Sequence, residues 1–184
     1  MKTLVALALF ASIGSTLSAQ SLNPTWEKDL STSLDLFVKC SSNADGKCSE
    51  AQGESLNTVY KVDDFFSAKQ GRHMTVSEVS SFLKQSSAWT SIGPAYTQAT
   101  LVQAQQLANE KKAVVAVYQN AANVGHVVLI VPGELEPSGS WGLKVPAAAS
   151  FFLPEPSRSF VNKGLSFAFT KSMLKDVTLY VRKY

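Results

Sequence analysis

Two side chains in this sequence have the types and surroundings of a nucleophile and its base. Cys48 stands where the pattern predicts the start of a helix, and His126 opens an apolar run over residues 127–131. A thiol at a helix N-terminus is biased toward the thiolate, and a neighbouring imidazole can take its proton and return it. The chain has only two cysteines and two histidines, so few pairings exist. Cys48 with His126 predicts a cysteine hydrolase.

Each of these residues also has a structural interpretation. Cys40 lies a short loop before Cys48, and paired cysteines in an exported chain usually form a disulfide, which would leave no free nucleophile. A transient disulfide between Cys40 and Cys48 would act as a reversible redox switch. His126 is also explained as a core histidine with satisfied hydrogen bonds. The other histidine, His73, is in a polar stretch, and we expect it to face solvent or a substrate.

A cysteine–histidine pair usually needs a third group that orients the imidazole. Ser138 and Ser140 are candidates because they enter the next predicted strand, and Asn162 or a backbone carbonyl are alternatives. The two histidines and two cysteines lack the spacing of a zinc site, and no glycine-rich phosphate loop is present. The sequence therefore predicts chemistry without a metal or a cofactor.

The elements that must position these groups follow from periodicity and end signals. Helical spacing of apolar residues predicts helices over residues 24–38, 48–62, 75–89 and 100–111. The third begins with a capping box, Thr75 with Glu78 three residues on. Strands are predicted over residues 113–119, 126–131, 140–145, 165–169 and 177–182, the first two as a hairpin, with long loops over 132–139 and 154–163. Helices followed by an antiparallel sheet indicate an α+β fold.

The N-terminus has the pattern of a cleavable signal peptide over residues 1–19, with Lys2, an apolar stretch and a small residue at Ala19. That stretch is too short for a membrane span. Residues 20–184 are then one exported domain, which we expect to be periplasmic or secreted and monomeric. The formal charge is +3, and loss of Lys2 lowers it by one. So weak a charge argues against a nucleic-acid partner.

The order of these parts resembles the NlpC-type and CHAP-type papain-like cysteine peptidases, which are bacterial cell-wall hydrolases. One subset combines a helix ending in Ala-Asn-Glu, an apolar strand, a polar turn and a Gly-His-Val segment closed by Pro-Gly. Similar segments occur here at residues 107–110, 114–117 and 125–133, with further likeness at 82–89, 141–142 and 162–169. The likeness covers most of residues 48–184.

The resemblance implies a fold of N-terminal helices packed on a C-terminal antiparallel sheet. It implies an exported hydrolase that cleaves amide bonds in the stem peptides of peptidoglycan, either as an endopeptidase or as an amidase. Cys48 would attack the carbonyl, its backbone N–H would help to hold the oxyanion, and His126 would protonate the leaving amine. A secreted toxin would use the same chemistry. The alternative is a non-catalytic secreted binding or inhibitory domain in which a disulfide joins Cys40 and Cys48.

Overall fold

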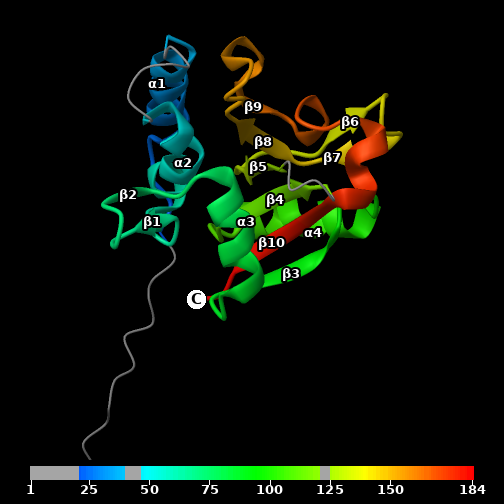
Figure 1. Ribbon diagram of the computed structural model, residues 1–184. Helices are drawn as coiled ribbons and strands as arrows, with labels where there is room; N and C mark the ends of the chain where they lie inside the picture. Colours follow the sequence, from blue (N-terminus) through cyan, green and yellow to red (C-terminus); the bar gives the residue numbers. More distant parts are fainter. Residues whose placement is uncertain (1–20, 40–46, 121–124) are drawn as a thin grey trace, which may run out of the picture.

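The computed structural model describes residues 21–39, 47–120 and 125–184. Its centre is a six-stranded sheet with the order β3-β10-β4-β5-β8-β9, in which every neighbouring pair is antiparallel (Figure 1). The strands are β3 (Trp89–Pro94), β4 (Val114–Gln119), β5 (Gly125–Ile130), β8 (Ala147–Ser150), β9 (Phe160–Gly164) and β10 (Val177–Arg182). Two small pairs lie outside this sheet, namely β1 (Phe66–Ser67) with β2 (Arg72–His73) and β6 (Glu136–Ser138) with β7 (Leu143–Val145).

Helices cover both faces of the sheet. The α-helices are α1 (Trp26–Val38), α2 (Ala51–Tyr60), α3 (Val76–Gln85) and α4 (Gln98–Asn109). Shorter 3-10 helices are η1 (Lys47–Glu50), η2 (Pro156–Arg158), η3 (Leu165–Phe167) and η4 (Lys171–Asp176). In Figure 1, α1 and α2 stand together beside the sheet. No helix in the described part of the chain is long and apolar enough to cross a membrane.

The two faces of the sheet form two separate hydrophobic cores. In the first core, α1, α2 and α3 bury side chains such as Leu30, Leu56 and Val79 against one face. In the second core, α4 and the 3-10 helices η3 and η4 cover the other face. Side chains alternate along a strand, so β5 sends Val127 to the first core and Val128 to the second. Each fully buried residue of this kind contributes about 1.5–3 kcal/mol.

Buried polar side chains tie the helices to the middle of the sheet. The Tyr60 hydroxyl at the end of α2 donates a 2.8 Å hydrogen bond to the carbonyl of Ile130. On the opposite face, the Gln105 amide of α4 donates to the carbonyl of Val131 and accepts from the backbone N–H of Ala147. Because backbone groups at strand ends must be satisfied, these contacts fix where β5 and β8 begin to separate.

Asp64 joins three distant parts of the chain. Its carboxylate accepts hydrogen bonds from the Trp89 indole at 2.8 Å and from the Arg182 guanidinium at 2.8 and 3.1 Å. Arg182 in turn lies over the ring of Tyr184, whose hydroxyl accepts from the backbone N–H of Ala113. The carboxylate therefore links the segment after α2 to β3 and β10.

The α+β class is confirmed, because helices pack on an antiparallel sheet. The order of elements differs from the prediction in the helical half. The pair β1 and β2 lies between α2 and α3, and β3 precedes α4, which covers the opposite face from the first three helices. The predicted third helix, over residues 75–89, ends at Gln85 instead. Residues 89–94 pair with β10 because their backbone groups find partners there, although Gly93 and Pro94 are residue types that are depleted in strands.

The second half of the sheet was predicted less well. The predicted strand over residues 165–169 is wrong, because the 3-10 helix η3 and a turn occupy this segment. The predicted loop over 154–163 includes η2 and most of β9. The predicted strand over 140–145 is only β7, which pairs with β6 outside the main sheet. By contrast, the hairpin of β4 and β5 and the strand β10 are confirmed. The predicted signal peptide over residues 1–19 lies outside the described residues.

Candidate functional site

Cys48 is buried in η1, the 3-10 helix that leads directly into α2. Its sulfur is disulfide-bonded and does not titrate. Cys40, the only other cysteine of the sequence, lies outside the described residues. In this state the sulfur cannot serve as a thiolate nucleophile.

His126 lies on the opposite face of the sheet from Cys48. Along β5, Val127 and Leu129 belong to the first core, which also contains Cys48. His126 alternates with them and therefore shares a face with Val128, which belongs to the second core. Its ring contacts confirm the side, because Phe169 is also part of the second core. The structure thus does not bring the predicted nucleophile and the predicted base together.

The imidazole of His126 is enclosed by aromatic and polar groups from β8 and the segments that follow. Its Nε2 shares a 2.7 Å hydrogen bond with the Ser150 hydroxyl, and its ring stacks on Phe152 with 4.3 Å between centroids. The Arg158 guanidinium lies over the ring of Phe152, 4.8 Å from its centroid. Burial, together with the positive charge of Arg158, lowers the pKa of His126 to about 4. The ring is therefore neutral at pH 7.

Ser150 is the partner of His126 that sequence reasoning missed. Its side chain is fully buried, so the pair offers no exposed hydroxyl to a substrate, and we interpret it as structural. The three candidates for the orienting group lie elsewhere. Ser138 and Ser140 share a hydrogen bond with each other, and Asn162 donates to Glu27 of α1. The only local feature of the sequence at Ser150 is the run of three alanines before it, whose small side chains leave room for neighbouring groups.

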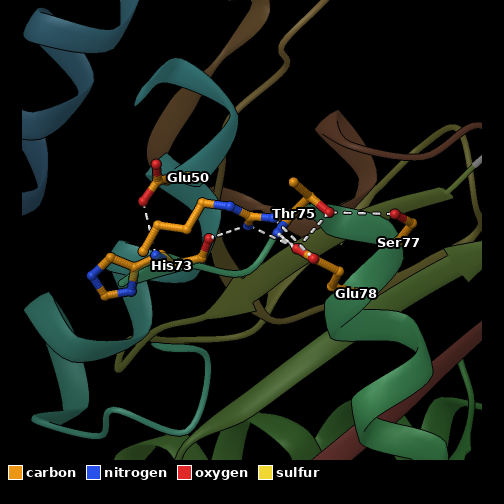
Figure 2. Close-up of polar contacts among 6 residues, drawn as sticks. Glu50, His73, Thr75, Ser77 and Glu78 are labelled. Carbon is orange, nitrogen blue, oxygen red and sulfur yellow. Dashed lines mark hydrogen bonds and ion pairs between the residues drawn. The ribbon is translucent and has the colours of Figure 1, made fainter. Parts of the chain in front are cut away.

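His73 and its neighbours form a polar network beside the start of α3 (Figure 2). The backbone N–H of His73 donates to Glu50 at 2.8 Å, while its imidazole points away from Thr75 and Ser77. Glu78 accepts from the backbone N–H of Thr75 at 2.7 Å, which forms the predicted capping box. It also accepts from both terminal nitrogens of Arg72. These hydrogen bonds, of which the one from Arg72 has the largest effect, lower the pKa of Glu78 to about 2.

A cavity of about 300 Å³ opens beside Cys48, on the first-core side of the sheet. We call it the Cys48 cavity. It is lined by Phe37, Cys48, Ser49, Gln52, Thr75, Val76, Ser77, Gly125, Phe151 and Leu153. None of these side chains is charged. A pocket of this size and character takes a neutral, largely apolar group with a few hydrogen-bonding atoms.

Gln52, which lines this cavity, has a side-chain oxygen that is buried and unsatisfied. It is only 4% exposed, and its Oε1 has no hydrogen-bond partner in the described structure. The orientation of the amide is fixed by Ser55, whose hydroxyl donates its single proton to the backbone carbonyl of Gln52 at 2.7 Å. Ser55 can therefore only accept from the side-chain amide, which places Nε2 toward it at 3.3 Å. A buried acceptor without a partner costs about 1–3 kcal/mol.

A second cavity, of about 270 Å³, shares Phe37 and Cys48 with the first. We call it the α1–α2 cavity. Its other lining residues are Ser33, Leu36, Ala51, Glu54 and Ser55. Glu54 is the single charged side chain among the residues that line the two cavities. No cluster of three or more His, Cys, Asp or Glu side chains that could hold a metal occurs within the described ranges.

The described residues around the Cys48 cavity do not include a paired nucleophile and base. The Cys48 cavity has apolar walls, hydroxyl groups and a buried acceptor, but its sulfur is bonded and the partly buried imidazole of His126 lies across the sheet. Neither a protein-family model nor a curated protein sequence matches this chain.

Proposed function

We propose that this chain is a non-catalytic, exported binding domain with a papain-like arrangement, and that its ligand site is the Cys48 cavity. The observation that carries the proposal is the position of Cys48. It is disulfide-bonded, and it belongs to the core on the opposite face of the sheet from His126. Of the two functions that the sequence left open, the binding or inhibitory domain with a Cys40–Cys48 disulfide agrees with this arrangement.

The arrangement does not suit a hydrolase for two separate reasons. A cysteine hydrolase needs a thiolate, and it needs a base within hydrogen-bond reach of that sulfur. Reduction would meet the first requirement. It would leave the second unmet, because His126 would still share its hydrogen bond with Ser150 in the second core.

The papain-like arrangement rests on the resemblance and on the position of α2. A short helical segment that contains Cys48 packs on an antiparallel sheet. The cavity opens where that segment meets the start of α3, the start of β5 and the residues just after β8. Substrate grooves of cysteine hydrolases need the same opening beside the cysteine. In this proposal the chain keeps the opening as a binding site and uses the disulfide to hold its wall.

The test separates the state of the thiol from the activity of the chain. The mass of the native protein after iodoacetamide treatment is measured with and without reductant. We expect no alkylation until reductant is added. Release of amino groups from purified peptidoglycan is then measured for the oxidised and the reduced protein, and we expect none from either.

The Cys40→Ser variant makes this test stringent, because it frees Cys48 permanently without altering it. Its matched control is the double variant Cys40→Ser with Cys48→Ser. We expect both variants to be equally inactive on peptidoglycan. Cleavage by Cys40→Ser that is lost in the double variant would overturn the proposal and restore the hydrolase.

A further inference from the structure

We infer that the ligand of this domain is a peptide with two apolar side chains and a basic residue, docked across the Cys48 cavity and the α1–α2 cavity. The inference rests on the proposed function and specifies its ligand. The chemistry of the occupant follows from the size of the two cavities, their rims, their charge and the hydroxyl groups that line the Cys48 cavity.

The two cavities adjoin each other, and each is of a size that holds one side chain of a ligand. At about 300 and 270 Å³, each lies near or below the lower limit for a small-molecule pocket. They share Phe37 and Cys48 as walls, so one ligand can enter both. Alternate side chains of an extended peptide point to the same side. A peptide can therefore fill both cavities from a single backbone.

The rims of the cavities expose hydrophobic side chains. Leu36 lines the α1–α2 cavity and is 67% exposed, and Leu153 lines the Cys48 cavity and is 41% exposed. Single exposed hydrophobic residues are ordinary on protein surfaces. Leu36 and Leu153, however, lie at two cavities that share walls, and exposed apolar side chains beside a cavity are typical of an interaction site.

The charge of the occupant follows from Glu54. Its carboxylate has no ion pair or hydrogen bond in the part of the chain that the structure describes. No basic side chain lines either cavity. A cation placed beside Glu54 is therefore favoured, and an anionic ligand is repelled.

The hydroxyl groups of the Cys48 cavity favour a peptide over an acyl chain. Thr75 and Ser77 line this cavity, and a hydroxyl can both donate and accept hydrogen bonds. A peptide backbone supplies N–H and C=O groups along its whole length. A hydrocarbon chain would remove water from these hydroxyls without replacing its hydrogen bonds, which is costly.

The test uses the oxidised full-length mature protein and three labelled, end-blocked pentapeptides in fluorescence anisotropy. The first has leucines at positions two and four and lysines at both ends. The second replaces both lysines with glutamates, and the third replaces both leucines with serines. We expect the first to bind, and the other two to bind about tenfold more weakly or not at all.

Three variants locate the binding. Leu36→Ser and Leu153→Ser should each weaken the first peptide by about tenfold, because they remove apolar contact at the rims. Glu54→Gln should weaken the lysine peptide by about threefold and reduce its advantage over the glutamate peptide. Tyr96→Ser is the matched control, since Tyr96 is 58% exposed but lines neither cavity. It should bind like the unmodified protein.

Several outcomes would overturn the inference. Equal affinity for the lysine and glutamate peptides would refute the role of Glu54. Binding that Tyr96→Ser weakens as much as Leu36→Ser would show nonspecific adhesion. Displacement of the first peptide by a dodecyl chain, but not by unlabelled peptide, would identify a lipid site instead. Failure of all three peptides with an oxidised, inactive protein would refute only the ligand, whereas amide cleavage by Cys40→Ser would refute the binding domain itself.

Discussion

The imidazole of His126 makes the stability of this protein depend on pH in a definite direction. Its folded-state pKa is about 4, below the ordinary value of 6.5. Above pH 6.5 the ring is neutral in both states, and its contribution to stability is complete. As the pH falls toward 4, the unfolded chain takes up the proton and the folded chain does not. The free energy of unfolding should fall by up to about 3 kcal/mol in that window.

Urea unfolding at pH 7 and pH 4.5 measures this effect. The His126→Gln variant is the matched control, because glutamine can hydrogen-bond to Ser150 and does not titrate. Its free energy of unfolding should change less between the two pH values. The carboxyl of Glu78, with its pKa of about 2, titrates mostly below this window. An unchanged pH dependence in His126→Gln would contradict the prediction.

The sequence identified the residues of interest better than it predicted their contacts. Cys48 lines the main candidate cavity, and the disulfide was one of two alternatives. The face on which His126 lies was not predictable, because a shift of one residue in strand register moves every side chain to the other face. Ser150 was missed for a related reason: its partner is distant in sequence, and nothing local marks a serine as buried.

At the level of elements, the start of α3 depends on Glu78. Its carboxylate accepts from the Thr75 backbone and from Arg72, and so satisfies an otherwise unpaired N–H at the helix start. The Glu78→Ala variant should lose about 1 kcal/mol of unfolding free energy in urea titration. Ser81→Ala on the same helix is the control, because Ser81 is exposed and bonds only within the helix. A loss in Ser81→Ala equal to that in Glu78→Ala would argue against the cap.

Elements with strong local signals were predictable, and those held by distant partners were not. The helix α3 has both an end signal and apolar spacing, and the β4–β5 hairpin is almost continuously apolar. By contrast, β8 begins with three alanines, which have low strand propensity. The segment at residues 165–169 has apolar residues at alternate positions, yet it begins as a 3-10 helix. Periodicity alone cannot separate these cases in short segments.

At the scale of the whole molecule, the disulfide at Cys48 should stabilise the fold by restricting the unfolded chain. The loop between the two cysteines of the sequence is short, which sets the gain at about 2–3 kcal/mol. Reduction should therefore lower the midpoint of thermal unfolding by about 5–10 °C. Circular dichroism melts with and without reductant measure this. The double variant of Cys40 and Cys48 to serine should melt like the reduced protein and should not respond to reductant.

Asp64 has a similarly global role, because one carboxylate bonds Trp89 and Arg182 on different strands. The Asp64→Ala variant leaves both donors without their partner and should lose about 2–3 kcal/mol of unfolding free energy. Asp35→Ala is the matched control, since Asp35 is exposed on α1. The measurement is urea titration, and the threshold is about 1 kcal/mol, the usual value of one ordinary hydrogen bond. If the Asp64→Ala variant loses less unfolding free energy than this, water replaces the carboxylate at little cost, which would contradict the prediction.

The position of β10 has a consequence for how the protein is made. This strand comes after all the other described strands in the sequence, yet it lies between β3 and β4 in the sheet. Until residues 177–182 have been made, β3 has no strand partner in this sheet and β4 is paired on one side only, with β5. The nascent chain therefore exposes the two strand edges that β10 later covers, and such edges attract other chains. The six-stranded sheet is complete only after translation of β10, so a chaperone that shields nascent β3 and β4 would raise the yield of folded protein.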